Sequence, residues 1–353
     1  MSYLYVNEDG VVVSIEENRC TAKYKDGMIK YMPIEALEGI VIMGRSQLTT
    51  YCMEQCLERG INVSFFSKSG RYFGRLHSTG HVKTDRQRRQ CELYDSQFAI
   101  DLSKRIISAK LKNQEVVLRR YERSKNINLK DIHNMMSICR NKIENCDSVY
   151  EIMGYEGQGA KYYFDGLSQC IKEDFAFHGR SRRPPLDEFN SMIGLGYSVL
   201  MNEIYEKIEE KGLNPYFGFM HRDAEKHPTL ASDLMEEWRA VIVDATVMSI
   251  INGNEITKEE FIHNVDEPGC YLNRKGVGIL IKKLEKKFQT DVKYLIYIDY
   301  SVDFRHAMLL QVNQLVKAME NEDSVRLYQI KGKGNVTSWG KNENYNVDEV
   351  IIL

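Results

Sequence analysis

Four residues in three separate segments carry the side chains that a divalent cation binds. They are Glu156 in the sequence GYEGQGA, His221 at the end of the aromatic run PYFGFMH, and Asp233 and Glu236 in the sequence LASDLMEEWR. Carboxylate oxygens joined by an imidazole nitrogen suit Mg²⁺ or Mn²⁺. A cation held in this way polarises a phosphoryl oxygen, so the pattern indicates phosphodiester chemistry without an organic cofactor.

The acidic segment has the spacing of a helix over residues 229–250. About 100° of rotation per residue puts Asp233, Glu236, Glu237 and Asp244 on one stripe. Like charges at this spacing destabilise a helix slightly, and a bound cation would relieve the repulsion. Two alternatives stay open: the acids lie in water on an amphipathic helix, or a basic side chain such as Arg239 neutralises them.

Glu156 and His221 also have structural alternatives. Glu156 lies near the start of a predicted helix over residues 157–174, where a carboxylate favours the positive end of the helix dipole. A histidine after an apolar run is often a hydrogen-bonded structural residue. His221, however, closely precedes the acidic helix, and a loop that folds back would place its ring against that helix.

The elements that must position these residues predict an α+β protein. Residues 1–85 form a small β-rich domain of short β-branched and aromatic runs with turn signals between them, at residues 3–6, 11–15, 29–33, 39–43 and 61–66. A helix over residues 47–59 ends at Gly60. Residues 86–330 form a larger, all-α domain that holds the metal site, because apolar residues there recur at helical intervals. Residues 331–353 form a polar tail.

Composition limits the class of protein. The chain has 353 residues, of which 43% are apolar and 28% charged, and a formal net charge of −2, which excludes a uniformly basic nucleic-acid binder. Local basic clusters remain, at Arg86 to Arg89, Arg119-Arg120, Arg180 to Arg183 and residues 282–287. They suit phosphate contacts, or are solvated helix faces. With scattered cysteines, no secretion signal and no membrane-length apolar run, we expect reduced thiols in a cytoplasmic protein.

In their order along the chain, several motifs resemble the CRISPR-associated "Cas one" family, the integrase and endonuclease of spacer acquisition. The motifs are GYEG at 154–157 with an aromatic helix after it, RRPP at 182–185 followed by Asn190 and Tyr197, GFMH at 218–221, and LASDLME at 230–236. The upstream segments DRQRRQ at 85–90 and KLKNQ at 110–114 are similar to that family as well.

The resemblance implies both a site and partners. It implies metal ligands at Glu156, His221 and Glu236, with Asp233 as a supporting or second-metal ligand. DNA would be contacted or positioned by basic and polar residues, namely Arg86, Arg88, Arg89, Lys110, Arg182, Arg183, Asn190 and Tyr197. The implied protein is a homodimer, joined through the β-rich domains, that works with a dimer of the small "Cas two" protein. It would insert double-stranded spacer precursors into a CRISPR repeat with Mg²⁺ or Mn²⁺.

Two other functions remain possible from the sequence. The first is a non-catalytic nucleic-acid scaffold in which the acids only cap helices. The second is a metallohydrolase for a small molecule, which would have a closed apolar pocket around the same residues.

Overall fold

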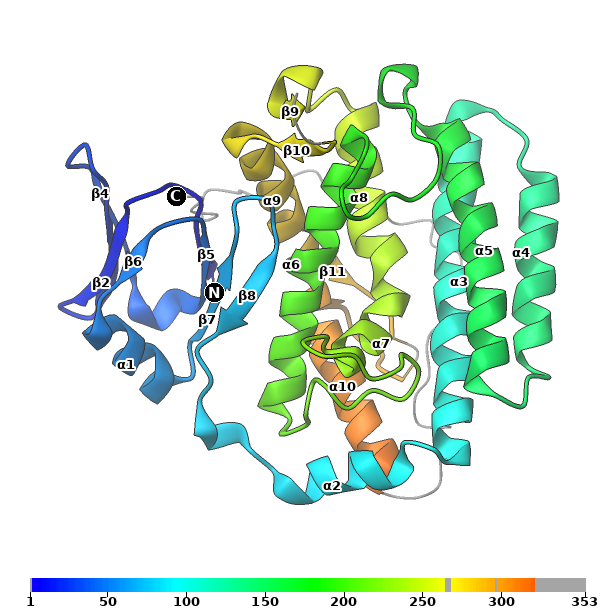
Figure 1. The fold of residues 1–353 in the computed structure, drawn as a ribbon, viewed down its shortest axis with the longest axis horizontal. Coiled ribbons are helices and arrows are strands. Elements are labelled where there is room, and N and C mark those ends of the chain that lie inside the picture. Colours follow the sequence, from blue (N-terminus) through cyan, green and yellow to red (C-terminus); the bar gives the residue numbers. More distant parts are fainter. Residues whose placement is uncertain (1, 264–267, 296, 321–353) are drawn as a thin grey trace.

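The computed structural model describes residues 2–263, 268–295 and 297–320. A strand-rich N-terminal part lies beside a larger helical part (Figure 1). The N-terminal part has two four-stranded sheets, in the orders β1-β5-β7-β8 and β4-β3-β2-β6. Their strands are β1 Ser2–Val6, β2 Val12–Glu16, β3 Arg19–Lys23, β4 Ile29–Pro33, β5 Leu37–Met43, β6 Gln47–Leu48, β7 Asn62–Phe66 and β8 Tyr72–Arg75.

Local sequence explains how these strands are connected. Between β6 and β7, helix α1 (Thr50–Arg59) is capped by the Thr49 side chain and ends at Gly60, whose φ of 70° is left-handed. Glycine adopts that conformation at no steric cost. The crossover lets β7 run parallel to β5. The sequence analysis omitted strand β3, because Arg19–Lys23 alternates polar and small residues rather than carrying an aromatic or branched run.

The helical part is built from long helices, as expected. They are α2 Thr84–Leu93, α3 Gln97–Lys125, α4 Lys130–Ile143, α5 Val149–Cys170, α6 Glu188–Glu210, α7 Thr229–Trp238, α8 Ala245–Asn252, α9 Arg274–Phe288 and α10 Phe304–Glu320. Two short hairpins interrupt them, β9 (Phe261–His263) with β10 (Cys270–Leu272) and β11 (Asp291–Val292) with β12 (Val302–Asp303). The α+β class is confirmed, although the larger part is mostly rather than purely helical.

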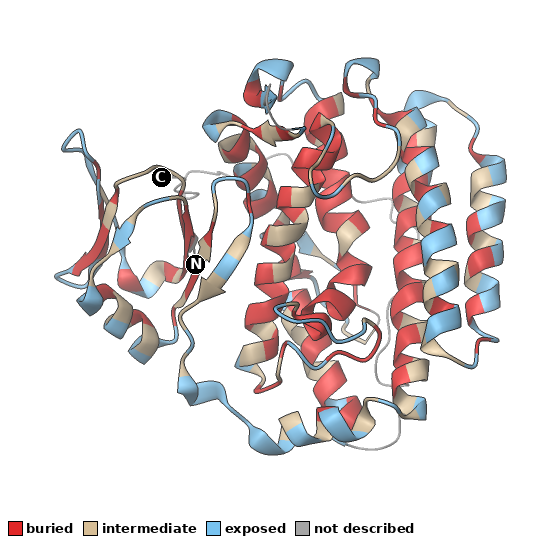
Figure 2. Ribbon diagram, in the orientation of Figure 1, coloured by how far each residue is buried: buried red, intermediate tan, exposed pale blue. Residues whose placement is uncertain are grey.

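The two faces of the β1-β5-β7-β8 sheet, called the first sheet below, pack into two different hydrophobic cores. Its side chains on one face, including Tyr5, Met43 and Phe66, pack into the large core of the helical part. Those on the other face, including Leu4 and Ile42, pack against the second sheet and α1. Figure 2 shows the resulting bands of buried residues on both sides of this sheet. Alternation along each strand therefore fixes the β-rich part against the helices.

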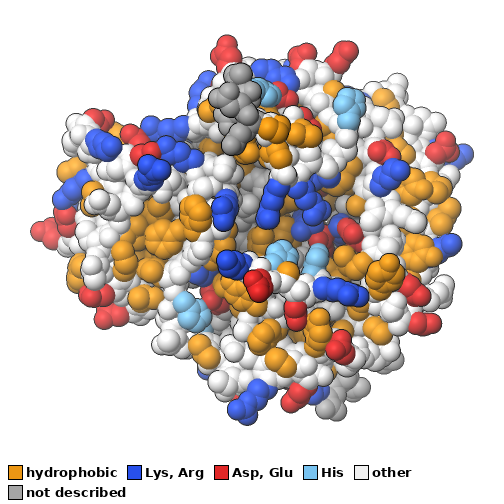
Figure 3. Space-filling model, in the orientation of Figure 1, with side chains coloured by type: hydrophobic (Ala, Val, Ile, Leu, Met, Phe, Trp, Pro, Cys, Tyr) orange, Lys and Arg blue, Asp and Glu red, His pale blue; other side chains and the backbone are white. Residues whose placement is uncertain are grey.

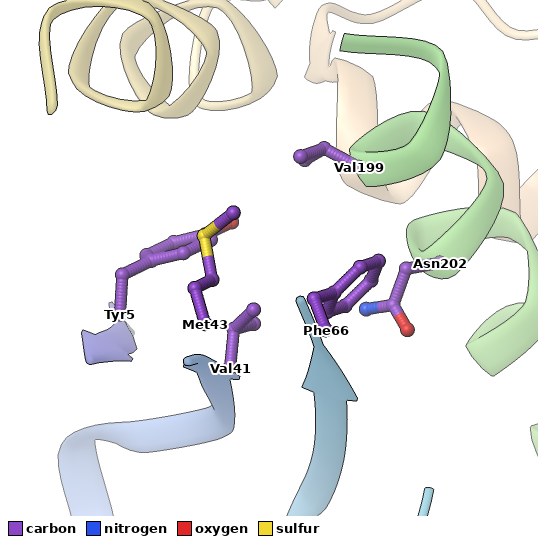
Figure 4. Close-up of a pocket in the computed structure, with 6 residues that line it drawn as sticks. All are labelled: Tyr5, Val41, Met43, Phe66, Val199 and Asn202. Carbon is purple, nitrogen blue, oxygen red and sulfur yellow. The ribbon is translucent and has the colours of Figure 1, made fainter. Parts of the chain in front are cut away.

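A small pocket lies where this sheet meets α6. Tyr5, Val41, Met43 and Phe66 approach it from the strands, and Val199 and Asn202 approach it from α6 (Figure 4). It is enclosed mainly by apolar side chains of the interface between the two parts. It lies apart from the acidic residues described next.

Helices α7 and α8 form the centre of the helical part. They are joined by a π-helical segment, Arg239–Asp244, and nearly every residue from 229 to 251 is buried. Asp233, Glu236, Glu237 and Asp244 are each at most 3% exposed. The amphipathic alternative, with these acids in water, is therefore wrong.

The described helices include none that is both long enough and apolar enough to span a membrane. The eight cysteines all lie in described segments, and none of them forms a disulfide there. The tail predicted at 331–353 lies outside the described residues.

Candidate active site

Two of the predicted acids form ion pairs with one lysine, and the three residues come from three helices. Helix α5 supplies Glu156, helix α7 supplies Glu236, and helix α3 supplies Lys110, which is 3% exposed. The Lys110 ammonium lies 2.6 Å from Glu236 Oε2 and also forms an ion pair with Glu156 Oε1. A buried cation therefore already lies between the two carboxylates, as their mutual repulsion requires.

Glu156 lies in the middle of its helix rather than at its start. Ser148 caps α5 at its N-terminus, and the helix runs on through the glycine-rich segment. Gly159 contacts α3 closely, because a Cβ built there would lie 2.4 Å from Leu111 Cδ2. This close approach brings Glu156 within reach of Lys110, and the interpretation of Glu156 as a helix-dipole partner is wrong.

Glu236 is held ionised by its basic neighbours. Burial alone would raise its pKa, but Arg239, Lys110 and His221 together lower the pKa to about 2. Arg239 Nη1 lies 2.7 Å from Glu236 Oε1. Arg239 begins the π-helical segment, and π-bulges of this kind often occur at functional sites.

His221 is aimed at the same carboxylate by Asp233. His221 Nε2 lies 3.8 Å from Glu236 Oε1, and His221 Nδ1 lies 2.7 Å from Asp233 Oδ1. The fully buried Asp233 also accepts the backbone N–H groups of Phe219, Met220 and His221. Asp233 thus fixes the loop and the ring, and its oxygens are already used. This differs from the ligand role that we expected for it.

A second buried acid lies behind the site. Asp244 accepts hydrogen bonds from Tyr163, at 2.9 Å, and from Tyr197, at 2.6 Å. Burial raises the pKa of Asp244 to about 6, against the lowering effect of these two hydroxyls. The Tyr197 ring also lies between the Arg180 and Arg239 guanidiniums, at 5.4 and 5.0 Å from its centroid. Tyr197 therefore orients two arginines.

The donor set fits a divalent cation. Glu156 and Glu236 share the Lys110 ammonium, and His221 Nε2 lies beside Glu236. Asp233 fixes the histidine tautomer, and the Lys110 ammonium shows that positive charge is stable between the acids. Lys110 nevertheless occupies the space between the two carboxylates and keeps the potential ligand atoms apart. In the described part of the chain, only Glu188, His263 and Cys270 have potential ligand atoms that all lie within 4.8 Å of one another.

The residues expected to meet DNA fall into two groups. Arg88, Arg182 and Arg183 are exposed. Figure 3 shows basic side chains around a hollow in the middle of one face, with histidines beside them. Arg183 is close enough to His227, next to His221, to help lower the pKa of His227, although burial of that ring is the larger cause.

The other group is engaged inside the protein. Asn190 is 1% exposed and its amide binds Gly179, Ser181 and Asp187. Arg86 donates to Lys211 O, and Arg89 donates to Met319 O, so both tie α2 to neighbouring elements. Lys110 and Tyr197 are used as described above. These five residues position other groups rather than offering free contacts to a ligand.

Sequence reasoning missed two members of the site. These are Tyr163 and Asp244, of which Asp244 was considered only as part of the acidic stripe. An acid within the apolar run AVIVDATV was the available signal, since an aspartate there needs buried hydrogen-bond donors.

Comparison with known proteins identifies the family of this chain. The sequence model of the family described as CRISPR associated protein Cas1 matches residues 4–286. The chain belongs to the Cas1 family. A CRISPR-associated endonuclease Cas1 of Mycobacterium tuberculosis is 34% identical over 331 residues, which cover 94% of this chain and 97% of the relative. A Cas1 endonuclease of Thermus thermophilus is 28% identical over 90% of this chain and 94% of its own length.

Solved structures share the fold. A CAS1 protein from Thermotoga maritima matches with a TM-score of 0.79 and 21% identity, over 92% of this chain and 99% of that chain. A casposase bound to an integration product matches with a TM-score of 0.83 and 20% identity, over 99% and 96% of the two chains. The Cas1 fold, with a strand-rich N-terminal part and a helical part behind it, is therefore present in full.

Proposed function

We propose that this Cas1-family protein is a metal-dependent DNA endonuclease and integrase that inserts new spacers into a CRISPR array. The observation that carries the proposal is that Glu156 and Glu236, from two helices, share the buried Lys110 ammonium, and that His221 Nε2 approaches the same Glu236 carboxylate. Relatives named as CRISPR-associated endonucleases and the fold shared with an integration-product complex support it.

In this proposal, Glu156, Glu236 and His221 Nε2 would hold Mg²⁺ or Mn²⁺ in place of the Lys110 ammonium that now pairs with both carboxylates. The bound cation would supply a Lewis acid for a phosphoryl oxygen and for the charge that develops during in-line displacement. Asp233 keeps the proton on His221 Nδ1, so that Nε2 carries the free lone pair. Arg239 offsets the charge of Glu236 and keeps it ionised.

The partners follow from the same surface and from the relatives. Arg182 and Arg183, exposed on the loop before α6, would contact DNA phosphates, while Asn190 and Tyr197 hold Arg180 of the same loop. Solved complexes of similar fold combine Cas1 with Cas2 and with DNA. We propose that this chain acts as a homodimer joined through its β-rich part, with a Cas2 dimer, on spacer precursors and the repeat.

Strand transfer tests the proposal. We expect Glu156→Gln and His221→Ala to abolish joining of a labelled DNA end to supercoiled plasmid with Mn²⁺, while DNA affinity changes little. Asp165→Asn is the matched control, because Asp165 lies exposed on the same helix as Glu156. Full transfer by both site variants would disprove the proposed catalytic role.

A chelator separates the alternative functions. A nucleic-acid scaffold would bind DNA equally well with and without chelator and would join no ends. The apolar pocket between the sheet and α6 lies away from the acids, so nothing in the described residues favours a small-molecule metallohydrolase.

A further inference from the structure

A second group of metal-binding side chains lies at the N-terminal end of α6. It consists of Glu188 at the first position of that helix, His263 at the end of β9 and Cys270 at the start of β10. One potential ligand atom from each lies within 4.8 Å of the other two. None of these residues belongs to the site proposed for phosphodiester chemistry.

The fold brings the three together by backbone contacts. His263 and Cys270 face each other directly in the antiparallel pair of β9 and β10, so their side chains share one face. The Cys270 N–H donates to Pro185 O at 2.8 Å, which ties the hairpin to the loop that leads into α6. Glu188 follows that loop by three residues and reaches the same face.

Two of the distances between the ligand atoms are close to those of a tetrahedral site, and the third lies within 4.8 Å. Cys270 Sγ lies 3.8 Å from His263 Nε2, and His263 Nε2 lies 3.4 Å from Glu188 Oε1. A cation bound at roughly 2.0–2.3 Å by sulfur, nitrogen and oxygen in tetrahedral geometry separates its ligands by about 3.3–3.6 Å. A cation therefore needs only a small adjustment of these side chains.

From this geometry we propose a Zn²⁺-class site at Glu188, His263 and Cys270 that clips the β9–β10 hairpin to α6. The thiolate and imidazole select a borderline-soft cation over Mg²⁺, which prefers oxygen ligands only. His263 is 60% exposed at its side chain, so water reaches the fourth coordination position.

Metal binding would release the proton of the Cys270 thiol and displace the Lys258 ammonium from Glu188. The Cys270 thiol is fully buried, and the metal binds its deprotonated sulfur. On binding, the S–H bond breaks, its electron pair forms the metal–sulfur bond, and the proton leaves to solvent. No redox step is involved.

Lys258 competes with the metal. Its ammonium lies 2.7 Å from Glu188 Oε1 and is half exposed, so it can turn into solvent when a cation takes that oxygen. If these residues only stabilised the hairpin through a histidine–carboxylate pair, replacing Lys258 would weaken that stabilisation. If they bind a metal, replacing Lys258 should raise the metal affinity, and this difference in sign makes the proposal testable.

Cobalt gives a direct readout of sulfur ligation. Full-length protein stripped with chelator is titrated with Co²⁺ in excess Mg²⁺, and the near-ultraviolet sulfur-to-cobalt band is followed; Zn²⁺ then displaces Co²⁺. We expect one equivalent to saturate the band. His263→Ala, a change at an exposed side chain, should weaken binding by more than about tenfold. Lys258→Met should tighten it several-fold, and Cys270→Ser should remove the band.

Cys91→Ser is the matched control, because Cys91 is the exposed cysteine and lies elsewhere, on α2. It should leave the band and its midpoint unchanged. A wild-type protein without the band, a band that persists in Cys270→Ser, or weaker binding in Lys258→Met would overturn the proposal. Strand transfer by the proposed active site is independent of each of these outcomes.

Discussion

Asp233 holds His221 at two points, since its Oδ1 lies 2.9 Å from the His221 backbone nitrogen and 2.7 Å from ring Nδ1. Its Oδ2 takes the N–H groups of Phe219 and Met220. Every one of these groups donates, so the position needs a side chain that only accepts. The carboxylate therefore sets both the path of the loop and the ring nitrogen that faces Glu236.

Asp233→Asn should lower Mn²⁺ affinity and strand transfer by about 10–100-fold. The introduced amide has one acceptor oxygen, so its NH₂ group must face either the ring or the backbone donors. Isothermal titration with Mn²⁺ and the plasmid-joining assay measure the effect. Glu225→Gln, an exposed charge change in the same loop, is the control. Equal Mn²⁺ affinity in the Asp233 and Glu225 variants would contradict the positioning role.

Lys110→Met should make the protein depend on metal for stability. Without Lys110, two carboxylates face each other across a buried space, and loss of one partner of a buried ion pair costs about 3–5 kcal/mol. A divalent cation then replaces the lost charge. We expect a lower Tm in chelator and a larger rise of Tm with Mn²⁺ than in the wild type.

Lys104→Met controls for loss of a lysine on the same helix, because Lys104 donates to the carbonyl of the exposed Glu144, away from Glu156 and Glu236 in the sequence. Its Mn²⁺-induced shift should match that of the wild type. If Lys110→Met showed that same shift as well, the lysine and the metal would not share one position.

Sequence periodicity predicted most helices and the β-rich beginning, because both patterns arise from burial of one face. It did not predict how α7 would be buried. An acidic stripe looks the same in water as in a core. Arg239, three residues after Glu236, was foreseeable as its local partner, but the tertiary contact from Lys110 was not. The motifs located Glu156, His221 and Glu236, but could not show that Asn190 turns its amide inward to the preceding loop.

Two glycines that follow Glu156 in α5, Gly157 and Gly159, should respond oppositely to alanine. At Gly159 an added Cβ would lie 2.4 Å from Leu111 Cδ2, within a closely packed contact of α3 and α5. Gly159→Ala should therefore lower the free energy of unfolding by about 1–3 kcal/mol. Gly157 has no neighbour within 4 Å of that position, so Gly157→Ala should raise it by about 0.5–1 kcal/mol through helix propensity.

Urea unfolding measures both changes, and Leu111→Ala tests their cause. In that background the methyl group at residue 159 has room, so the cost of Gly159→Ala should shrink. If Gly159→Ala lowered the free energy of unfolding equally in both backgrounds, the contact with Leu111 would not be the cause of the loss.

The interface between the first sheet and α6 should carry a pH dependence through Glu206. This carboxyl accepts from the Tyr3 hydroxyl at 2.5 Å and from Asn202 at 3.1 Å, and is 3% exposed. Burial raises the pKa of Glu206 to about 7, and the neighbouring Glu203 adds to the rise. In an unfolded chain the value is about 4.3. Between these two values the folded protein binds the extra proton, so stability falls as pH rises.

Glu206→Gln replaces the protonated form with a neutral isostere and should remove this slope. At pH 8 we expect the variant to unfold at a higher urea concentration than the wild type, with a free energy of unfolding that is larger by about 1–3 kcal/mol. At pH 5 the two should differ little. Glu210→Gln, on the exposed side of the same helix, should leave the slope in place. A wild-type slope retained in Glu206→Gln would mean that another group takes up the proton, because the glutamine cannot.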